Sequence, residues 1–157
     1  MLTIIGCGNA NRSDDAVGIV VAQSLNSYLD KNPNNNVNIF DAGTSGMDVM
    51  FMARGCEQLI IVDASSTGSD PGAIYEVPGE ELENIPAPSY NLHDFRWDNA
   101  LYAGRKIFKE NFPKKVNVYL IEAESLEFGL DLSKSVNQSA DIVIDKIITI
   151  INNYEHV

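Results

Sequence analysis

The chain alternates short aliphatic runs with longer stretches whose apolar residues recur at helical spacing. The short runs end at glycine or acidic residues, which is typical of parallel strands buried on both faces. They predict strands over residues 2–5, 37–40, 59–62 and 116–121. A further strand is predicted over 73–77; because a loop rather than a helix precedes it, we expect it to pair antiparallel at the edge of the sheet.

The longer stretches predict helices between these strands. The first begins at Ser13 or Asp14, the second covers the region of Met47 and ends at Gly55, the third follows Asp98, and a long last helix starts at Ser133. Alternating strands and helices favour an α/β fold with a doubly wound, mostly parallel sheet, and right-handed crossovers bring every strand-to-helix turn to one edge.

Composition limits the partners of this fold. The 157 residues suit a single domain, 1–157, with a full hydrophobic core. Lys and Arg total 11 against 22 Asp and Glu, and the resulting net charge of −11 disfavours nucleic acid. No apolar run approaches the roughly 20 residues of a membrane span, and no basic leader precedes the first strand. We therefore expect a cytoplasmic protein without membrane association, in which Cys7 and Cys56 are free thiols.

Three aspartates stand where strands run into turns. Asp15, Asp41 and Asp63 come from separate turns that share one sheet edge, close to where the strand order reverses. Their mutual repulsion must be offset by positive charge, and a cation is the simplest source. His93 would complete a set of two carboxylates and one imidazole, with an open position for substrate.

Less specific interpretations exist for each of these residues. Asp14 and Asp15 suit the first turn of a helix, Asp41 and Asp63 can each accept hydrogen bonds from their own turns, and a lone loop histidine is most often a surface residue. A dinucleotide site is disfavoured, because Asn11 stands where the third glycine of a Gly6-x-Gly8 fingerprint belongs. No HExxH pair supports a resident-zinc peptidase.

Taken together, the motifs resemble the [NiFe]-hydrogenase maturation endopeptidases over essentially the whole chain. The matching segments are Gly8-Asn9, Asp14-Asp15-x-Val17-Gly18, Asp41-x-Gly43-Thr44-x-Gly46, Leu59-Ile60-Ile61-x-Asp63-Ala64, His93, Glu124-Ser125-Leu126 and Gly129-Leu130-x-Leu132-Ser133. The resemblance implies a three-layer α/β/α sandwich around a five-stranded twisted sheet. It also implies a protease that removes a carboxy-terminal extension from the hydrogenase large-subunit precursor after nickel insertion.

The resemblance also implies roles for individual residues. The family's metal-contacting and catalytic positions fall on Asp15, Asp63 and His93, and its glycine-threonine turn near the cleft falls on Asp41, Gly43 and Thr44. In this family the nickel arrives with the precursor, so the metal reports that the substrate is ready; a resident divalent metal is left open. Residues 94–99 differ from many relatives, which points to a difference in the hydrogenase served.

Two further alternatives stay open at the level of sequence. Either the metal polarises the scissile carbonyl, or an aspartate such as Asp41 or Asp63 activates the attacking water. The rival to an enzyme is a non-catalytic α/β module whose acidic edge binds a metal or a basic peptide without cleaving it.

Overall fold

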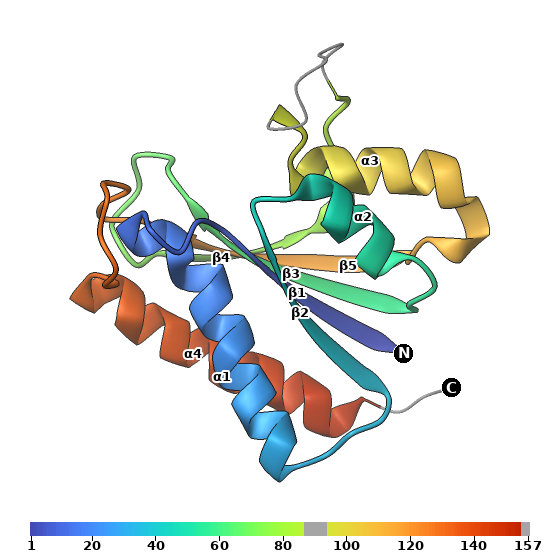
Figure 1. Ribbon diagram of the computed structural model, residues 1–157, viewed down its shortest axis with the longest axis horizontal. Helices are drawn as coiled ribbons and strands as arrows, with labels where there is room; N and C mark the ends of the chain where they lie inside the picture. Colours follow the sequence, from blue (N-terminus) through green and yellow to red (C-terminus); the bar gives the residue numbers. More distant parts are fainter. Residues whose placement is uncertain (87–93, 155–157) are drawn as a thin grey trace.

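The computed structural model describes residues 1–86 and 94–154 and contains one five-stranded sheet (Figure 1). The strands are β1 (Leu2–Cys7), β2 (Val37–Gly43), β3 (Gln58–Ser65), β4 (Ile74–Pro78) and β5 (Lys115–Glu122). Their order is β2-β1-β3-β5-β4, and every neighbouring pair is parallel except β4 with β5. The prediction of a mostly parallel sheet with one antiparallel edge strand is confirmed.

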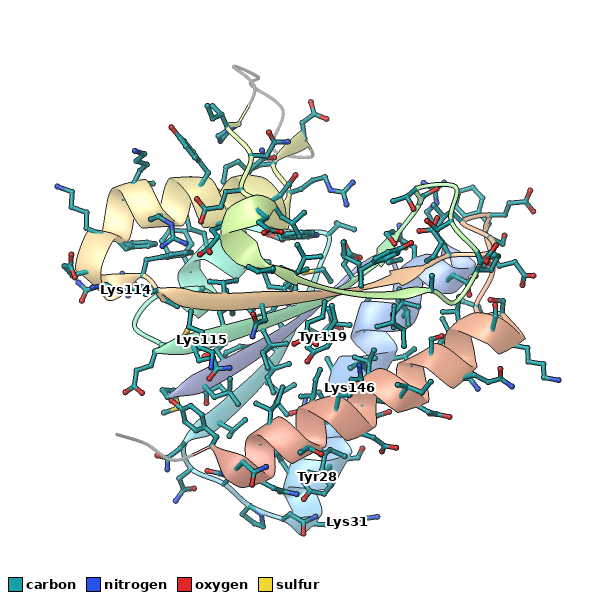
Figure 2. The ribbon with its side chains drawn as sticks, turned by 180° about the vertical axis from the view of Figure 1, so that it is seen from behind. Tyr28, Lys31, Lys114, Lys115, Tyr119 and Lys146 are labelled. Atoms are coloured by element: carbon teal, nitrogen blue, oxygen red, sulfur yellow. The ribbon has the colours of Figure 1, made fainter. Side chains whose placement is uncertain are left out.

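Four α-helices cover the two faces of the sheet. They are α1 (Val17–Lys31), α2 (Gly46–Ala53), α3 (Trp97–Phe108) and α4 (Lys134–Asn153), with short 3-10 turns η1 (Ser13–Ala16), η2 (Gly79–Glu81) and η4 (Lys109–Asn111). Helices α1 and α4 lie on one face, and α2 and α3 lie on the other (Figure 1). Figure 2 shows α4 crossing its face, with Tyr119 of β5 between helix and sheet. The three-layer α/β/α sandwich is confirmed.

The aliphatic runs fill both cores because successive side chains of a strand point to opposite faces. Ile4 and Ile60 pack under α1 and α4, whereas their neighbours Ile5 and Ile61 pack under α2 and α3. All four are fully buried. This two-sided burial explains why these strands lack the alternating polar residues of a sheet with one exposed face.

Element boundaries differ from the prediction mainly where polar residues continue a strand. β2 extends through Asp41 to Gly43, and β3 extends through Asp63 to Ser65, because both strands keep pairing with their neighbours past the aliphatic run. Gly55 has the positive φ, 84°, expected of the residue after a helix. Within residues 1–86 and 94–154, no helix is long and apolar enough to cross a membrane.

The start of α1 departs from expectation. Residues Ser13–Ala16 form a 3-10 turn, α1 begins at Val17, and no side chain caps either element. Asp14 is fully buried, and its carboxylate instead accepts hydrogen bonds from the backbone N–H groups of Glu124, Ser125 and Ser133 and from the Ser133 hydroxyl. The α-helix therefore begins at Val17 and not at the predicted Ser13 or Asp14, and Asp14 ties η1 to a distant loop.

Candidate active site

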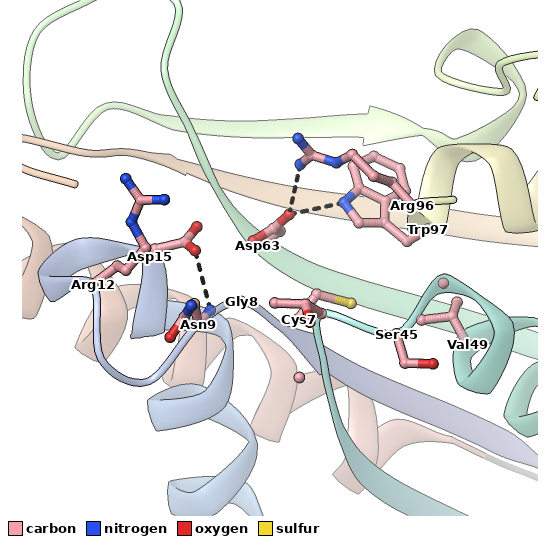
Figure 3. A pocket seen from close by; sticks show the side chains of 13 residues that line it. Cys7, Gly8, Asn9, Arg12, Asp15, Ser45, Val49, Asp63, Arg96 and Trp97 are labelled. Carbon is pink, nitrogen blue, oxygen red and sulfur yellow. Dashed lines mark hydrogen bonds and ion pairs between the residues drawn. The ribbon is translucent and has the colours of Figure 1, made fainter. Parts of the chain in front are cut away.

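A cleft of about 340 Å³ opens at the carboxyl ends of β1 and β3 (Figure 3). The chain passes from β1 to β2 on one side and then from β2 back across β1 to β3 on the other, so this is the point where the strand order reverses and where α/β sheets bind ligands. The lining residues come from the turn after β1, the turn before α2, the end of β3 and the start of α3. They are Cys7, Gly8, Asn9, Arg12, Asp15, Gly43, Thr44, Ser45, Gly46, Val49, Asp63, Arg96 and Trp97.

Asp15 enters the cleft from η1. Its Oδ2 accepts a hydrogen bond from the Asn9 backbone N–H across 3.1 Å, which fixes the carboxylate against the turn after β1 (Figure 3). This close approach depends on Gly8, because a Cβ there would lie 1.8 Å from the backbone oxygen of Asp15, and its φ of 142° disfavours other residues. Asp14 and Asp15 are adjacent, but of the two only the Asp15 side chain lines the cleft.

Asp63 lies at the floor of the cleft and is 4% exposed. Its Oδ1 accepts a hydrogen bond from the Ala64 backbone N–H (2.8 Å), and its Oδ2 accepts one from the Trp97 indole Nε1 (2.8 Å). The Arg96 guanidinium Nη2 lies 3.6 Å from the same Oδ2 (Figure 3). Oδ1 keeps a lone pair beyond its one hydrogen bond, so the carboxylate can still bind a cation.

The electrostatics of Asp63 favour a positive partner. Burial raises the pKa of Asp63 to about 7; the negative charge of Asp15 adds to the rise, while the hydrogen bonds from Trp97 and Ala64 and the charge of Arg96 oppose it. A divalent cation beside Asp63 would stabilise the ionised form of this carboxylate. Carboxylate oxygens such as those of Asp15 and Asp63 bind divalent cations, and a borderline metal would be favoured by the additional imidazole ligand predicted for His93.

The turn between β2 and α2 forms another wall. Gly43 and Thr44 line the cleft, as the resemblance implied. Asp41 does not line it: the side chain is exposed, and its Oδ1 accepts a hydrogen bond from the Gly43 backbone N–H across 2.8 Å. Asp41 thus shapes the turn that carries the two lining residues.

His93 lies outside the described residues. Within residues 1–86 and 94–154, no group of three or more His, Cys, Asp and Glu side chains is placed to hold a metal ion. The structure brings Asp15 and Asp63 to one cleft, and the assignment of His93 as third ligand stays a prediction.

Several cleft residues were not singled out for a role by the sequence. Arg96 and Trp97 were noted only as departures from relatives, yet both contact Asp63. Their position at the start of a helix that directly follows His93 was the available signal.

Arg12 and Cys7 also line the cleft. Burial and, second, the negative charge of Asp63 raise the pKa of the Cys7 thiol well above its ordinary value, which disfavours a nucleophilic thiolate. Both cysteines are free thiols, as predicted.

The fold and the cleft define a class: an α/β protein with an acidic site at the reversal of strand order, suited to a cation or to a peptide held beside one. A family model described as hydrogenase maturation protease matches residues 19–150. The chain belongs to the hydrogenase maturation protease family.

Individual relatives agree with this assignment. The chain is 29% identical to a putative hydrogenase maturation protease of Methanocaldococcus jannaschii, over 96% of this chain and 93% of the relative. It is 27% identical to the hydrogenase 2 maturation protease of Escherichia coli, over 94% of this chain and 88% of the relative. The solved structure of the hydrogenase maturating endopeptidase HybD from E. coli superposes with a TM-score of 0.79 at 25% identity, covering 96% of this chain and 91% of that one. An endopeptidase is thereby favoured over a non-catalytic module.

Proposed function

We propose that this protein is an endopeptidase that removes the carboxy-terminal extension of a [NiFe]-hydrogenase large-subunit precursor after nickel has been inserted. The observation that carries the proposal is the family match over residues 19–150, which includes the cleft residues contributed by β3, by the turn before α2 and by the start of α3. The two cleft carboxylates, Asp15 and Asp63, supply the chemistry that such a substrate requires.

In this proposal the nickel is part of the substrate. Asp15, Asp63 and His93 bind the nickel of the precursor, and the cleft then holds the adjoining peptide in a near-attack geometry. Gly43 and Thr44 offer backbone and hydroxyl groups along the wall where the extension would lie. Arg96, 3.6 Å from Asp63, balances the negative charge of the cleft before the substrate arrives. A resident divalent metal is not required by this scheme.

Two routes to peptide hydrolysis fit the cleft. In one, the nickel polarises the scissile carbonyl; in the other, a carboxylate accepts a proton from the attacking water. Among the aspartates considered for the second route, Asp63 lines the cleft, whereas the Asp41 carboxylate is exposed and bonded to its own turn. The base of the second route is therefore Asp63 rather than Asp41.

The test is a processing assay on a purified [NiFe]-hydrogenase large-subunit precursor, prepared with and without nickel. We expect a loss of mass equal to the extension only for the nickel-loaded precursor. Asp15→Asn, Asp63→Asn and His93→Ala should abolish cleavage, and Asp141→Asn, an exposed position on α4, should not. Binding of the precursor with no change in its mass would instead support the non-catalytic module.

The encounter with the precursor is expected in the cytoplasm, as the composition indicated. Fractionation of cells that express the protein, with detection in the soluble and membrane fractions, checks this location.

A further inference from the structure

The loop between β5 and α4, residues 123–133, displays two large apolar side chains to solvent. Phe128 is 88% exposed and Leu130 is 80% exposed. Leu132 of the same loop packs against the core under α1 and α4, so the core does not require the other two. Exposed apolar side chains of this size, two residues apart on one loop, are typical of a surface that another protein covers.

The loop is fixed, although it is irregular in structure. Asp14 accepts hydrogen bonds from the backbone of Glu124, Ser125 and Ser133, which anchors both ends of the loop to one buried carboxylate. Figure 1 shows the loop, in orange, beside the blue turn that precedes α1. Phe128 and Leu130 therefore stand on a framework that is already ordered before a partner arrives, which lowers the entropic cost of binding.

The middle of the loop is bonded to the turn that lines the cleft. Gly129 exchanges backbone hydrogen bonds with Asn11 and Ser13, each 2.9 Å long, and the Ser13 hydroxyl donates to the Glu127 carbonyl oxygen. Ser13 adopts a φ of 50°, a left-handed conformation that is strained for a residue with a side chain. The turn before α1 is therefore strained at Ser13, the residue whose backbone bonds to the loop.

Arg12 joins this surface to the cleft. Its guanidinium carbon lies 5.7 Å from the centre of the Phe128 ring, its Nε donates to the Leu126 carbonyl oxygen across 3.1 Å, and the same residue lines the cleft beside Asp15. Arg12 thus connects the cleft to the Phe128 side of the loop, so a protein whose peptide enters the cleft can also contact this loop.

The charges around the two apolar side chains indicate what covers them. The exposed residues Glu124, Glu127 and Asp131 lie on the same loop, on a chain with a net charge of −11, and Arg12 beside Phe128 is the positive charge that contacts this surface. An apolar patch with a basic rim would complement this surface, whereas a second copy of the same surface would bring like charges together.

We propose that Phe128 and Leu130, with their acidic rim, form the docking surface for the folded body of the hydrogenase large-subunit precursor, next to the extension that enters the cleft. This inference rests on the proposed function and adds a recognition site outside the cleft. Docking here contributes to binding of the whole precursor and not to the chemistry of peptide hydrolysis. The partner contributes an apolar patch with basic residues around it.

The test compares Phe128→Ala/Leu130→Ala with the wild type, using the purified nickel-loaded precursor as the probe. We expect KM for processing and Kd for binding to rise about tenfold or more, with kcat little changed, because removing central apolar anchors of an interface has effects of this size. Ile142→Ala, which truncates a half-exposed isoleucine on α4, is the matched control and should change neither. Thermal unfolding of each variant checks that the loop truncation leaves the fold intact.

Leu130→Ala alone separates the docking surface from an indirect effect on Arg12, because it leaves the Phe128 ring beside the guanidinium unchanged. A raised KM in this single variant supports docking, and an effect confined to Phe128→Ala would overturn it in favour of Arg12 placement. Unchanged KM and Kd in the double variant would also overturn it, as would wild-type dimers that the double variant converts to monomers.

The binding measurement keeps the two proposals separate. A wild-type protein that binds the precursor without cutting it contradicts the proposed function, and the docking surface is then decided by the Kd of the double variant. Cutting with equal KM by wild type and double variant contradicts the docking surface alone. If the wild type neither binds nor cuts the precursor, both the proposed function and the docking surface are contradicted.

Discussion

The indole Nε1 of Trp97 donates a hydrogen bond to Oδ2 of Asp63 across 2.8 Å, joining the start of α3 to the end of β3 at the floor of the cleft. This bond orients the carboxylate and favours its ionised form, because the donor stabilises negative charge on the oxygen. Helix α3 is thereby part of the site, although its sequence carries no acidic residue that lines the cleft.

Replacing Trp97 by Phe keeps most of the apolar volume and removes the indole donor. We expect kcat/KM for processing of the nickel-loaded precursor to fall about 10- to 100-fold, the usual cost of losing a group that orients a metal-binding carboxylate. The loss should also raise the pKa of Asp63 further, which nuclear magnetic resonance of the labelled carboxyl can follow. Tyr102→Phe removes a hydroxyl elsewhere on α3 and is the control; equal kcat/KM in both variants would contradict a role for the indole.

Arg96 competes with a cation for Asp63, since its guanidinium lies 3.6 Å from Oδ2. In Arg96→Gln we expect the protein without precursor to bind Ni²⁺ about 3- to 10-fold more tightly, a modest factor because the arginine side chain is 65% exposed and screened by solvent. Titration calorimetry with the metal alone measures this. Arg54→Gln, at an exposed arginine after α2, controls for net charge, and the same tightening there would contradict a local effect.

The buried Asp63 should make stability depend on pH. Its pKa of about 7 in the folded protein lies above the value of an unfolded aspartate, so the folded state binds more protons between about pH 4 and 7. The free energy of unfolding therefore falls as pH rises through this window, by an amount on the order of a few kcal/mol. Urea unfolding of metal-free protein across the window measures the slope, which Asp63→Asn should reduce; an identical slope in the variant would assign it to other groups.

Asp14 should be a stability residue. Asp14→Asn keeps the size of the side chain but places an amide among three backbone N–H donors, so we expect a loss of about 2 to 4 kcal/mol in the free energy of unfolding. Denaturant unfolding compares the variant with Asp141→Asn, which should stay near the wild type. An unchanged midpoint for Asp14→Asn would show that the loop does not depend on this carboxylate.

Two substitutions at Asp41 separate the role of its negative charge in processing from the role of its hydrogen bond in the stability of the turn. In Asp41→Asn the amide oxygen can still accept the hydrogen bond of the Gly43 N–H, so we expect a stability within about 0.5 kcal/mol of the wild type. The negative charge that this change removes lies next to the turn carrying the lining residues Gly43 and Thr44, so we expect slower or less selective processing. Asp41→Ala also removes the bond and should lower stability by about 1 kcal/mol. Melting temperature and processing rate, measured on both variants, separate the effects. Unchanged kinetics in Asp41→Asn toward cognate and non-cognate precursors would leave Asp41 as a turn residue only.

The sequence by itself determined the layers, the mostly parallel sheet and the edge at which the site lies. The runs at Ile4-Ile5 and Ile60-Ile61 required burial on both faces, and the handedness of crossovers then brought the turns carrying Asp15 and Asp63 to the same edge. These properties follow from local periodicity and chain chirality, which a sequence contains in full.

Only the tertiary structure decided what each polar side chain near that edge contacts. The 3-10 turn sends Asp14 into a loop 110 to 119 residues away and leaves its neighbour Asp15 in the cleft. Trp97 reaches Asp63 across 34 residues. Such contacts depend on the packing of elements that are distant along the chain, and local sequence patterns do not specify the direction of a side chain within a turn.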